Sequence, residues 1–147
     1  GLTAEDDVLV REASREIGIV KSSNMSIGVN VVFGLLRRSS ELLKGYKVSI
    51  TETHHVHKKD APSGTAKTMA EVIEGMTKEK VADIASVREG EVVGYHKVTF
   101  ESDVDTIEIS HNAKTRAMFA EGALVAAKFL AGKKAGLFNM QEVLGLT

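Results

Sequence analysis

The 147-residue sequence contains no cysteine and no tryptophan, and it has a single proline, Pro62. Without cysteine the chain can form no disulfide, thiolate nucleophile or thiolate metal site. Any chemistry must therefore come from histidine, lysine, carboxylates or hydroxyl groups. Aromatic residues make up only 5% of the chain, which argues against a surface that stacks nucleic-acid bases or sugars.

The sequence also lacks long apolar runs and an excess of charge of either sign. No segment approaches the roughly 20 apolar residues that a membrane-spanning helix requires, and the first residues are acidic, unlike a signal peptide. Nineteen basic and twenty acidic residues nearly cancel, which gives no argument for binding a phosphate backbone. We expect a cytoplasmic protein that binds neither membranes nor nucleic acid.

Hydrophobic periodicity predicts a mixed α/β fold with one open β-sheet flanked by helices. The patterns predict helices over residues 3–17, 26–44, 65–76 and 116–130, strands over 19–20, 46–53, 84–88, 92–101 and 106–110, and a short segment over 139–144. Thr3 and Asp6 resemble a capping box at the start of the first helix, and the polar residues 22–24 supply turn or cap chemistry before the second. The spacing predicts that the second helix has one buried face with Ile27, Val31, Leu35, Leu42 and Leu43, which lies either in the core or in a subunit contact. The first helix is expected to turn Val8, Leu9, Ala13 and Ile17 toward the protein.

A dense group of ionisable residues follows the predicted strand over residues 46–53. Three of the five histidines, two lysines and one aspartate lie within the seven residues from His54 to Asp60. Histidine exchanges protons near neutral pH, so His54 and Lys58 form a candidate proton-delivery pair. Alternatively, Lys58 stays charged and holds a substrate carboxylate, while His57 and Lys59 raise the local positive potential.

The same segment also allows a metal site. If the strand continues beyond residue 53, His54 and Lys58 share one face, whereas His55 and His57 share the other. Asp60 could then complete a set of metal ligands with His55 and His57. We regard this as the weaker alternative and expect no resident metal. His96 and His111 lie in predicted strands and are expected to be structural or surface residues outside the site.

Ser63, Gly64 and Thr65 open the next predicted helix. Free N–H groups and the helix dipole favour an anion at a helix N-terminus, and glycine lets a ligand approach the backbone closely. Pro62 fixes the entry to this turn, and the two hydroxyl groups add hydrogen-bond donors. Such a triplet alone is usually an ordinary helix cap. Its position beside the histidine cluster favours a site for an anionic substrate.

The whole run from Glu52 to Ala66 closely resembles the signature of the 4-hydroxy-tetrahydrodipicolinate reductase family, also called dihydrodipicolinate reductases. Further resemblance lies in residues 24–30, 88–90, 107–111, 116–123 and 136–140. This resemblance implies an oxidoreductase of diaminopimelate and L-lysine biosynthesis. Such an enzyme uses NADH or NADPH to reduce a dicarboxylate substrate to tetrahydrodipicolinate.

The resemblance also implies roles for individual residues. His54 matches the acid–base residue and Lys58 the proton donor, while His55, Ser63, Gly64 and Thr65 match substrate-binding positions. Positions near the nicotinamide correspond to Ser22, Ser23, Asn24, Met25, Arg116 and Phe119. Family members often carry an aromatic residue where Met25 stands, so a thioether is expected to replace a ring contact with the cofactor.

The resemblance divides the chain into three parts. Residues 1–24 are expected to be the remnant of an N-terminal dinucleotide-binding domain, with Gly1 in a loop after one of its strands. Residues 25–132 would form the substrate-binding, catalytic and oligomerisation domain, and residues 133–147 a C-terminal segment that packs back toward the N-terminal domain. The family's Gly-rich dinucleotide fingerprint is expected before Gly1, so we expect the chain alone to lack reductase activity.

The resemblance also implies a mixed open β-sheet flanked by helices, and homotetramers that form through contacts between sheets. The strands between Ile84 and Ser110 would then present apolar faces to neighbouring subunits. Two alternatives from other classes remain at this point. One is an inactive assembly or dicarboxylate-binding domain. The other, less favoured, is a His/Asp metal-binding protein.

Overall fold

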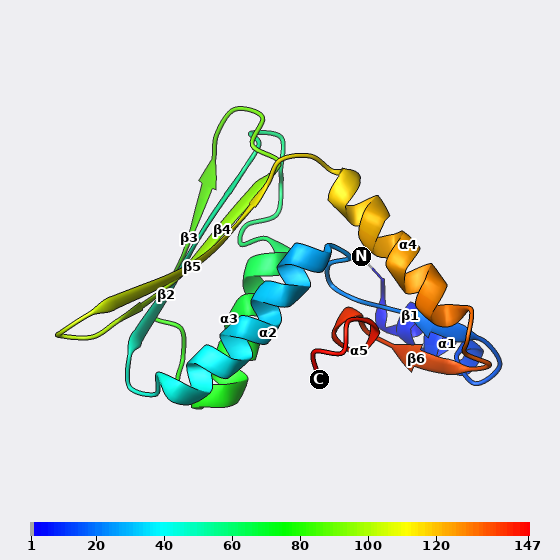
Figure 1. Ribbon diagram of the computed structural model, residues 1–147. Coiled ribbons are helices and arrows are strands. Elements are labelled where there is room, and N and C mark those ends of the chain that lie inside the picture. The colour runs from blue at the N-terminus through cyan, green and yellow to red at the C-terminus, as the bar shows by residue number, and fades with distance from the viewer. Residues whose placement is uncertain (1) are drawn as a thin grey trace.

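The computed structural model describes residues 2–147, and Gly1, for which we predicted a loop, lies outside this range. Helices and strands alternate along most of the described chain (Figure 1). In chain order the elements are α1 (Ala4–Ala13), β1 (Gly18–Val20), α2 (Ile27–Leu42), β2 (Lys47–His54), α3 (Gly64–Thr77), β3 (Asp83–Arg88), β4 (Gly94–Glu101), β5 (Thr106–Ala113), α4 (Ala117–Leu130), β6 (Gly136–Phe138) and α5 (Met140–Val143).

The main sheet has four strands in the order β3-β2-β4-β5. Strands β2 and β3 are parallel, whereas β2–β4 and β4–β5 are antiparallel, so the sheet is mixed as predicted. Helices α2 and α3 lie side by side on one face of this sheet (Figure 1). Their buried side chains form one core with those of β2 and β4, including Leu36, Ile50, Met69, Ile73 and Phe100.

The other face of the sheet is not apolar. Side chains alternate between the two faces of a strand, and the alternate positions of β2, β4 and β5 include Thr51, Lys97, Thr99 and Glu108. Ile107 and Ile109 instead pack against the core beneath α2 and α3. The expectation that the strands between residues 84 and 110 present apolar faces outward is therefore wrong.

A second, smaller sheet pairs β1 with β6 in parallel, with Gly18 opposite Gly136. Helix α4 leads from the main sheet to this second sheet (Figure 1). Helix α1 lies next to the second sheet. The prediction of one sheet is incomplete because β6 has only three residues, too few for a periodic pattern. None of the helices within residues 2–147 has the length and apolar character needed to cross a membrane.

Helix starts agree with the sequence patterns better than helix faces do. Thr3 and Asp6 form the predicted capping box of α1, and the hydroxyl groups of Ser26 and Ser63 cap α2 and α3. Most of the predicted buried face of α2 does not lie in the core, although Leu43 packs against it. Val31, Leu35 and Leu42 are 41%, 50% and 67% exposed, while the helix buries Val29, Val32, Phe33 and Leu36.

The error in α2 has a physical reason. This helix carries apolar residues on two sides, and periodicity alone cannot say which side meets the sheet. The prediction for α1 is wrong as well, because no residue of this helix is buried and Val8 and Leu9 are more than half exposed.

Candidate active site

All twelve residues that the sequence assigned to the site line one cavity of about 510 Å³. It opens where the end of β2, the start of α3, the segment before α2 and the start of α4 meet. Its lining residues are Ser22, Ser23, Asn24, Met25, His54, His55, Lys58, Ser63, Gly64, Thr65, Val93, Arg116 and Phe119. Only Val93 was not predicted. Residues up to 97 positions apart in the chain, from Ser22 to Phe119, therefore meet at one place.

The N-terminus of α3 forms one wall of this cavity. The hydroxyl oxygen of Ser63 accepts the N–H of Ala66 at 3.2 Å, which fixes the first turn. A Cβ at Gly64 would meet no atom within 4 Å, so a ligand can approach this backbone closely. The Nδ2 of Asn24 donates to the Oγ1 of Thr65 at 3.0 Å, which leaves the Thr65 hydroxyl proton free to donate to a ligand.

The histidine and lysine segment does not continue as a strand. Strand β2 ends at His54, and a turn follows in which the N–H of Lys58 donates to the carbonyl of His55 at 3.1 Å. The predicted alternation of faces beyond residue 54 is therefore wrong. Arg88 holds this turn from β3, since its guanidinium donates to the carbonyl oxygens of Lys58 at 3.3 Å and Asp60 at 2.5 Å.

Lys58 reaches the cavity from this turn. Its Nζ lies 2.8 Å from the Oδ1 of Asp60, and its side chain is only 23% exposed. Hydrogen bonding from Lys58 lowers the pKa of Asp60 below its ordinary value. The ammonium group is thus held next to His54 and the start of α3, where it adds positive charge to the cavity.

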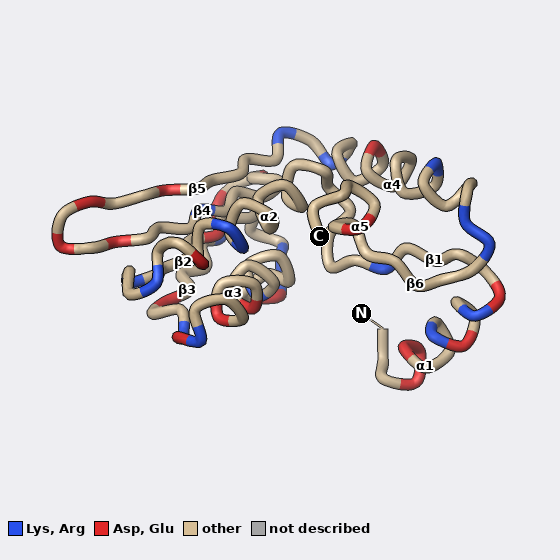
Figure 2. The backbone as a smooth tube through the Cα atoms, turned by 60° about the horizontal axis from the view of Figure 1, so that its bottom comes forward, with Lys and Arg blue, Asp and Glu red and all other residues tan. Residues whose placement is uncertain are grey.

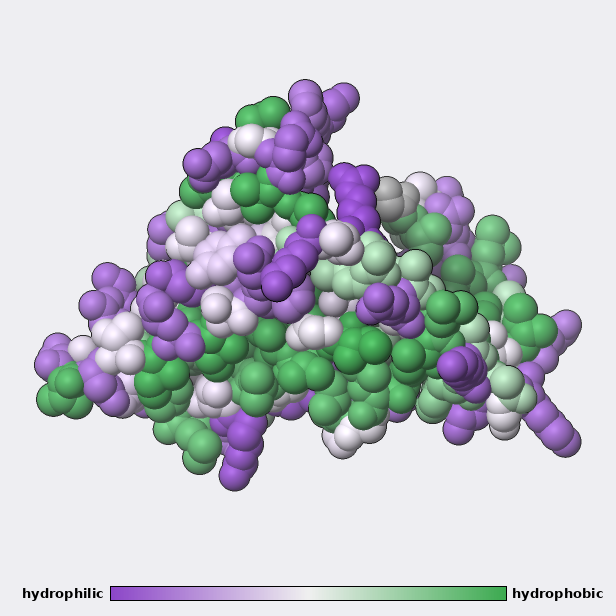
Figure 3. All heavy atoms as spheres, turned by 45° about the horizontal axis from the view of Figure 1, so that its top comes forward, coloured by the Kyte–Doolittle hydropathy of each residue, from purple (hydrophilic) through white to green (hydrophobic). Residues whose placement is uncertain are grey.

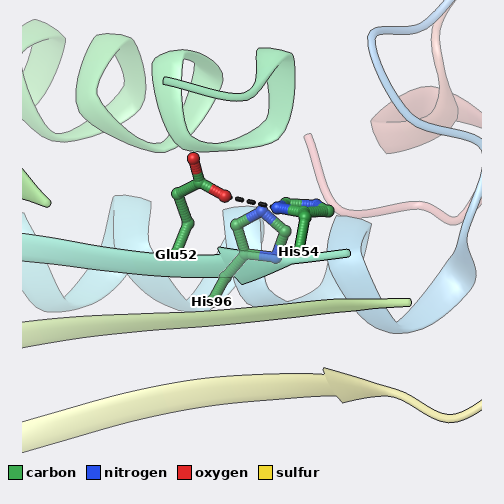
Figure 4. A group of neighbouring side chains, drawn as sticks. All are labelled: Glu52, His54 and His96. Atoms are coloured by element: carbon green, nitrogen blue, oxygen red, sulfur yellow. Dashed lines mark hydrogen bonds and ion pairs between the residues drawn. The ribbon is translucent and has the colours of Figure 1, made fainter. Parts of the chain in front are cut away.

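Beneath His54 lies a buried polar cluster (Figure 4). The side chain of Glu52 is fully buried, and its Oε2 contacts the Nδ1 of His54 while its Oε1 lies 2.9 Å from Nη2 of Arg88. The ring of His96 stands edge-on to that of His54, with 5.0 Å between centroids, and its Nε2 lies 3.1 Å from the Oγ of Ser63.

Burial and neighbouring charges set the protonation of this cluster. Burial alone raises the pKa of Glu52, but hydrogen bonds from Arg88, Ser86 and His54 outweigh it and hold the pKa below its ordinary value. Burial lowers the pKa of His54, although Glu52 partly opposes this effect. Burial and the nearby His54 lower the pKa of His96 to about 4. At neutral pH the cluster holds a carboxylate and two neutral imidazoles.

The opposite wall of the cavity comes from the start of α4 and the segment before α2. The Nη2 of Arg116 lies 3.3 Å from the Nε2 of His55. Arg116 belongs, with Lys114, to the basic link between β5 and α4 (Figure 2). A Cβ at Gly122 of α4 would lie 1.8 Å from the carbonyl oxygen of Met25. Only a glycine lets the helix approach Met25 this closely.

The predicted metal alternative is not supported by the positions of its residues. His57 is exposed with its Nε2 3.8 Å from Glu91, and Asp60 pairs with Lys58. Glu52, His54 and His96 do bring potential ligand atoms within 4.8 Å of one another. Arg88 and the His54 Nδ1 already occupy the two oxygens of Glu52, so we describe this group as a hydrogen-bonded cluster.

Sequence reasoning missed His96, Glu52 and Arg88 as parts of the site. A signal for His96 was present, because it alternates with the buried residues Val98 and Phe100 and so shares their face of β4. The strand pairing that places His96 opposite Glu52, and Arg88 opposite His54, could not be read from one sequence.

The fold and the cavity define an α/β domain in which a helix N-terminus, two histidines and a lysine line one cavity. The chain belongs to the dihydrodipicolinate reductase C-terminal family, whose family model matches residues 28–144.

Curated relatives agree with this assignment. The 4-hydroxy-tetrahydrodipicolinate reductase of Nitrosomonas eutropha is 45% identical over 166 residues, covering 99% of this chain and 62% of the relative. That of Nitrosospira multiformis is 49% identical over 154 residues, covering 91% of this chain and 57% of the relative. The chain thus spans about three-fifths of the length of the curated relatives it matches.

A solved structure shares the fold. It is described as a dipicolinate-bound dihydrodipicolinate reductase from Paenisporosarcina sp. TG-14, and it matches with a TM-score of 0.76 at 22% sequence identity. The match covers 97% of this chain and 61% of that structure.

Proposed function

We propose that this chain provides the substrate-binding and acid–base half of a 4-hydroxy-tetrahydrodipicolinate reductase. Such an enzyme is an oxidoreductase of diaminopimelate and L-lysine biosynthesis that uses NADH or NADPH. One observation carries the proposal: a single cavity joins the N-terminus of α3, where free N–H groups favour an anion, to His54 and Lys58. Family membership and the names of the curated relatives support it.

The substrate is a dicarboxylate, and the cavity offers it two sets of donors. One carboxylate would receive the free N–H groups at Gly64 and Thr65 together with the Thr65 hydroxyl. Charged and polar side chains of Lys58, His55 and Arg116 would hold the other. Ser63 lines the same wall, but its hydroxyl is already engaged with Ala66 and His96, so its main effect is to shape the turn.

The reduction adds one hydride and one proton to the ring and releases the 4-hydroxyl group as water. His54 and Lys58 are the groups that could exchange this proton, since both line the cavity. His54 is neutral at neutral pH because burial lowers its pKa, and Lys58 remains available as a charged donor beside it. Two adjacent groups in different protonation states suit the delivery of a single proton.

The hydride would come from a nicotinamide. Ser22, Ser23 and Asn24 give the cavity a polar edge, and Met25 with Phe119 gives it an apolar one, a combination that suits the carboxamide and ring of this group. The bound nicotinamide of NADH or NADPH would supply the hydride. The residues of this chain would orient its ring and exclude water from the ring face.

We also propose that copies of the chain assemble, as homotetramers. Hydrophobic side chains form a band across the face shown in Figure 3, and Val31, Leu35 and Leu42 of α2 are exposed apolar residues. Sedimentation should show a tetramer at micromolar concentration, weakened by Leu35→Glu but unaffected by Val104→Glu in the exposed β4–β5 turn. A monomeric wild-type chain would count against assembly.

Calorimetric titration with pyridine-2,6-dicarboxylate, a planar analogue of the product, tests the substrate site. We expect saturable binding with one site per chain, weakened about tenfold or more by Thr65→Ala because a hydrogen bond to a charged group is worth about 1.5–3 kcal/mol. Thr77→Ala, at the far end of α3, is the matched control and should bind like the wild type. Unchanged binding in a folded Thr65→Ala chain would contradict the proposed site.

A further inference from the structure

We propose that Glu52 is the positioning residue of His54: its buried carboxylate, anchored by Arg88, holds the Nδ1–H of His54 and leaves Nε2 as the nitrogen that exchanges protons in the cavity. The inference rests on the proposed role of His54 and adds a residue that does not itself line the cavity.

The geometry of β2 places these two side chains together. Residues 52 and 54 are two positions apart in a strand, so both point to the same face. Arg88 is the register partner of His54 on β3, and from there its Nη2 reaches the Oε1 of Glu52 at 2.9 Å. The N–H of Ser63 donates to the same oxygen at 3.3 Å. The other oxygen, Oε2, faces the Nδ1 of His54.

This arrangement fixes the tautomer of His54. The hydrogen bonds to Glu52 hold its pKa low, so it is a carboxylate that can only accept hydrogen bonds. The Nδ1 of His54 must then carry a proton and donate it to Glu52. The neutral imidazole consequently has its lone pair on Nε2. Hydrogen bonding to one ring nitrogen determines the chemistry available at the other.

Gly94 keeps Nε2 accessible. This residue lies on β4, and a Cβ at its position would be only 3.2 Å from the Nε2 of His54. The absence of a side chain leaves space next to the reactive nitrogen, while His96 packs against the ring from the same strand at position 96. The ring is thus held on one side by Glu52 and His96 and left open at Nε2.

The charges around His54 show why a carboxylate is needed there. Glu52 on β2 faces the ring together with Arg88 on β3 and Lys58 in the following turn, while His96 on β4 is neutral. Burial and the two cations lower the pKa of His54, and Glu52 is the group that opposes them. Loss of the negative charge would leave Arg88 without its buried partner.

The experiment is an imidazole nitrogen NMR measurement on the 147-residue chain, with signals of His54 assigned by comparison with His54→Gln. We expect the wild-type ring to be in the Nδ1–H form across the neutral range. In Glu52→Gln the amide can donate as well as accept a hydrogen bond, so the Nδ1–H form of His54 should no longer dominate. The pKa of His54 should fall because the negative charge that raises it is lost. Glu108→Gln breaks the ion pair with Lys97 on β4 and should leave His54 unchanged.

Two results of this measurement would refute the role of Glu52. A wild-type ring in the Nε2–H form overturns it even if Glu52→Gln does not fold. Glu52→Asp keeps the negative charge on a shorter side chain and should retain more of the Nδ1–H form of His54 than Glu52→Gln. An equal loss of the Nδ1–H form in both variants would show that the charge of residue 52 does not hold this tautomer. Neither result involves substrate, so a failure to bind pyridine-2,6-dicarboxylate would refute the proposed function separately.

Discussion

The imidazole ring of His96 stands at 77° to that of His54, and the two ring centroids are 5.0 Å apart. His96 is 4% exposed, and its Nδ1 is buried without a hydrogen-bond partner within residues 2–147. Protonating such a ring would place a charge in the core beside the imidazole of His54. The protonation state of His96 should therefore govern how the fold responds to acid.

Acid should destabilise the protein through His96. Its pKa is about 4 in the fold, lowered first by burial and then by His54, against about 6.5 in an unfolded chain. Between these values the unfolded chain binds a proton that the folded chain does not. Stability is thus complete above about pH 6.5 and falls as the pH drops toward 4, by about 3 kcal/mol in total.

Urea unfolding of wild type and His96→Gln at several pH values between 7 and 4 would measure this effect. The pKa values of His54 and His111 are also lowered by burial, so both forms should lose stability in acid, but the variant should lose less. The same dependence on pH in both chains would show that His96 does not contribute.

Gly122→Ala should distort the cavity wall. A methyl group there would lie 1.8 Å from the carbonyl oxygen of Met25, so α4 or the Met25 segment must move. Overpacking of this kind costs about 1–3 kcal/mol, which should appear as a lower thermal midpoint. Gly75→Ala is the matched control in α3, where a Cβ meets nothing within 4 Å, and it should stabilise by about 0.5–1 kcal/mol. Similar midpoints for the two variants would contradict the close approach of α4.

Two leucine truncations should separate the core from the surface. Leu36 is fully buried between α2, α3 and the sheet, so Leu36→Ala should cost about 2–5 kcal/mol in unfolding free energy. Leu9 on α1 is 62% exposed, and the same change there should stay within about 0.5 kcal/mol. Denaturant unfolding of both variants checks the result. A large loss for Leu9→Ala would mean that α1 is covered by another surface.

The 147-residue chain by itself should show negligible reductase turnover with NADH or NADPH. Its curated relatives are longer, and the sequence contains no glycine turn of the kind that holds a dinucleotide pyrophosphate. Following nicotinamide absorbance in the presence of substrate measures this directly. Turnover close to that of a full-length relative would refute the prediction.

Local chemistry made much of this protein predictable. Capping residues such as Thr3 and Ser63 mark helix starts because their side chains satisfy free N–H groups, and the structure confirms both; the cap of α2 is Ser26, just after the polar residues 22–24 that were expected to supply it. Six of the twelve predicted site residues lie within residues 54–65, where their spacing indicated a site; the family resemblance supplied the six at residues 22–25, 116 and 119.

Features that depend on tertiary packing could not be anticipated. The exposed face of α2, which carries Val31 and Leu35, has the same apolar pattern in sequence as a buried helix face. The pairing of β1 with β6 joins segments more than 100 residues apart. Glu52 and His96 reveal their role only once the register of β2 and β4 is known.

The most direct test of the account is amide NMR mapping of pyridine-2,6-dicarboxylate on the labelled chain. We predict that the largest shifts fall on the backbone N–H groups of Gly64 and Thr65 and around His54 and His55, which line the cavity. The β4–β5 turn around Val104 should not respond. Shifts confined to other surfaces, or no shifts at millimolar ligand in a folded chain, would contradict the claim that this cavity is the substrate half of a reductase site.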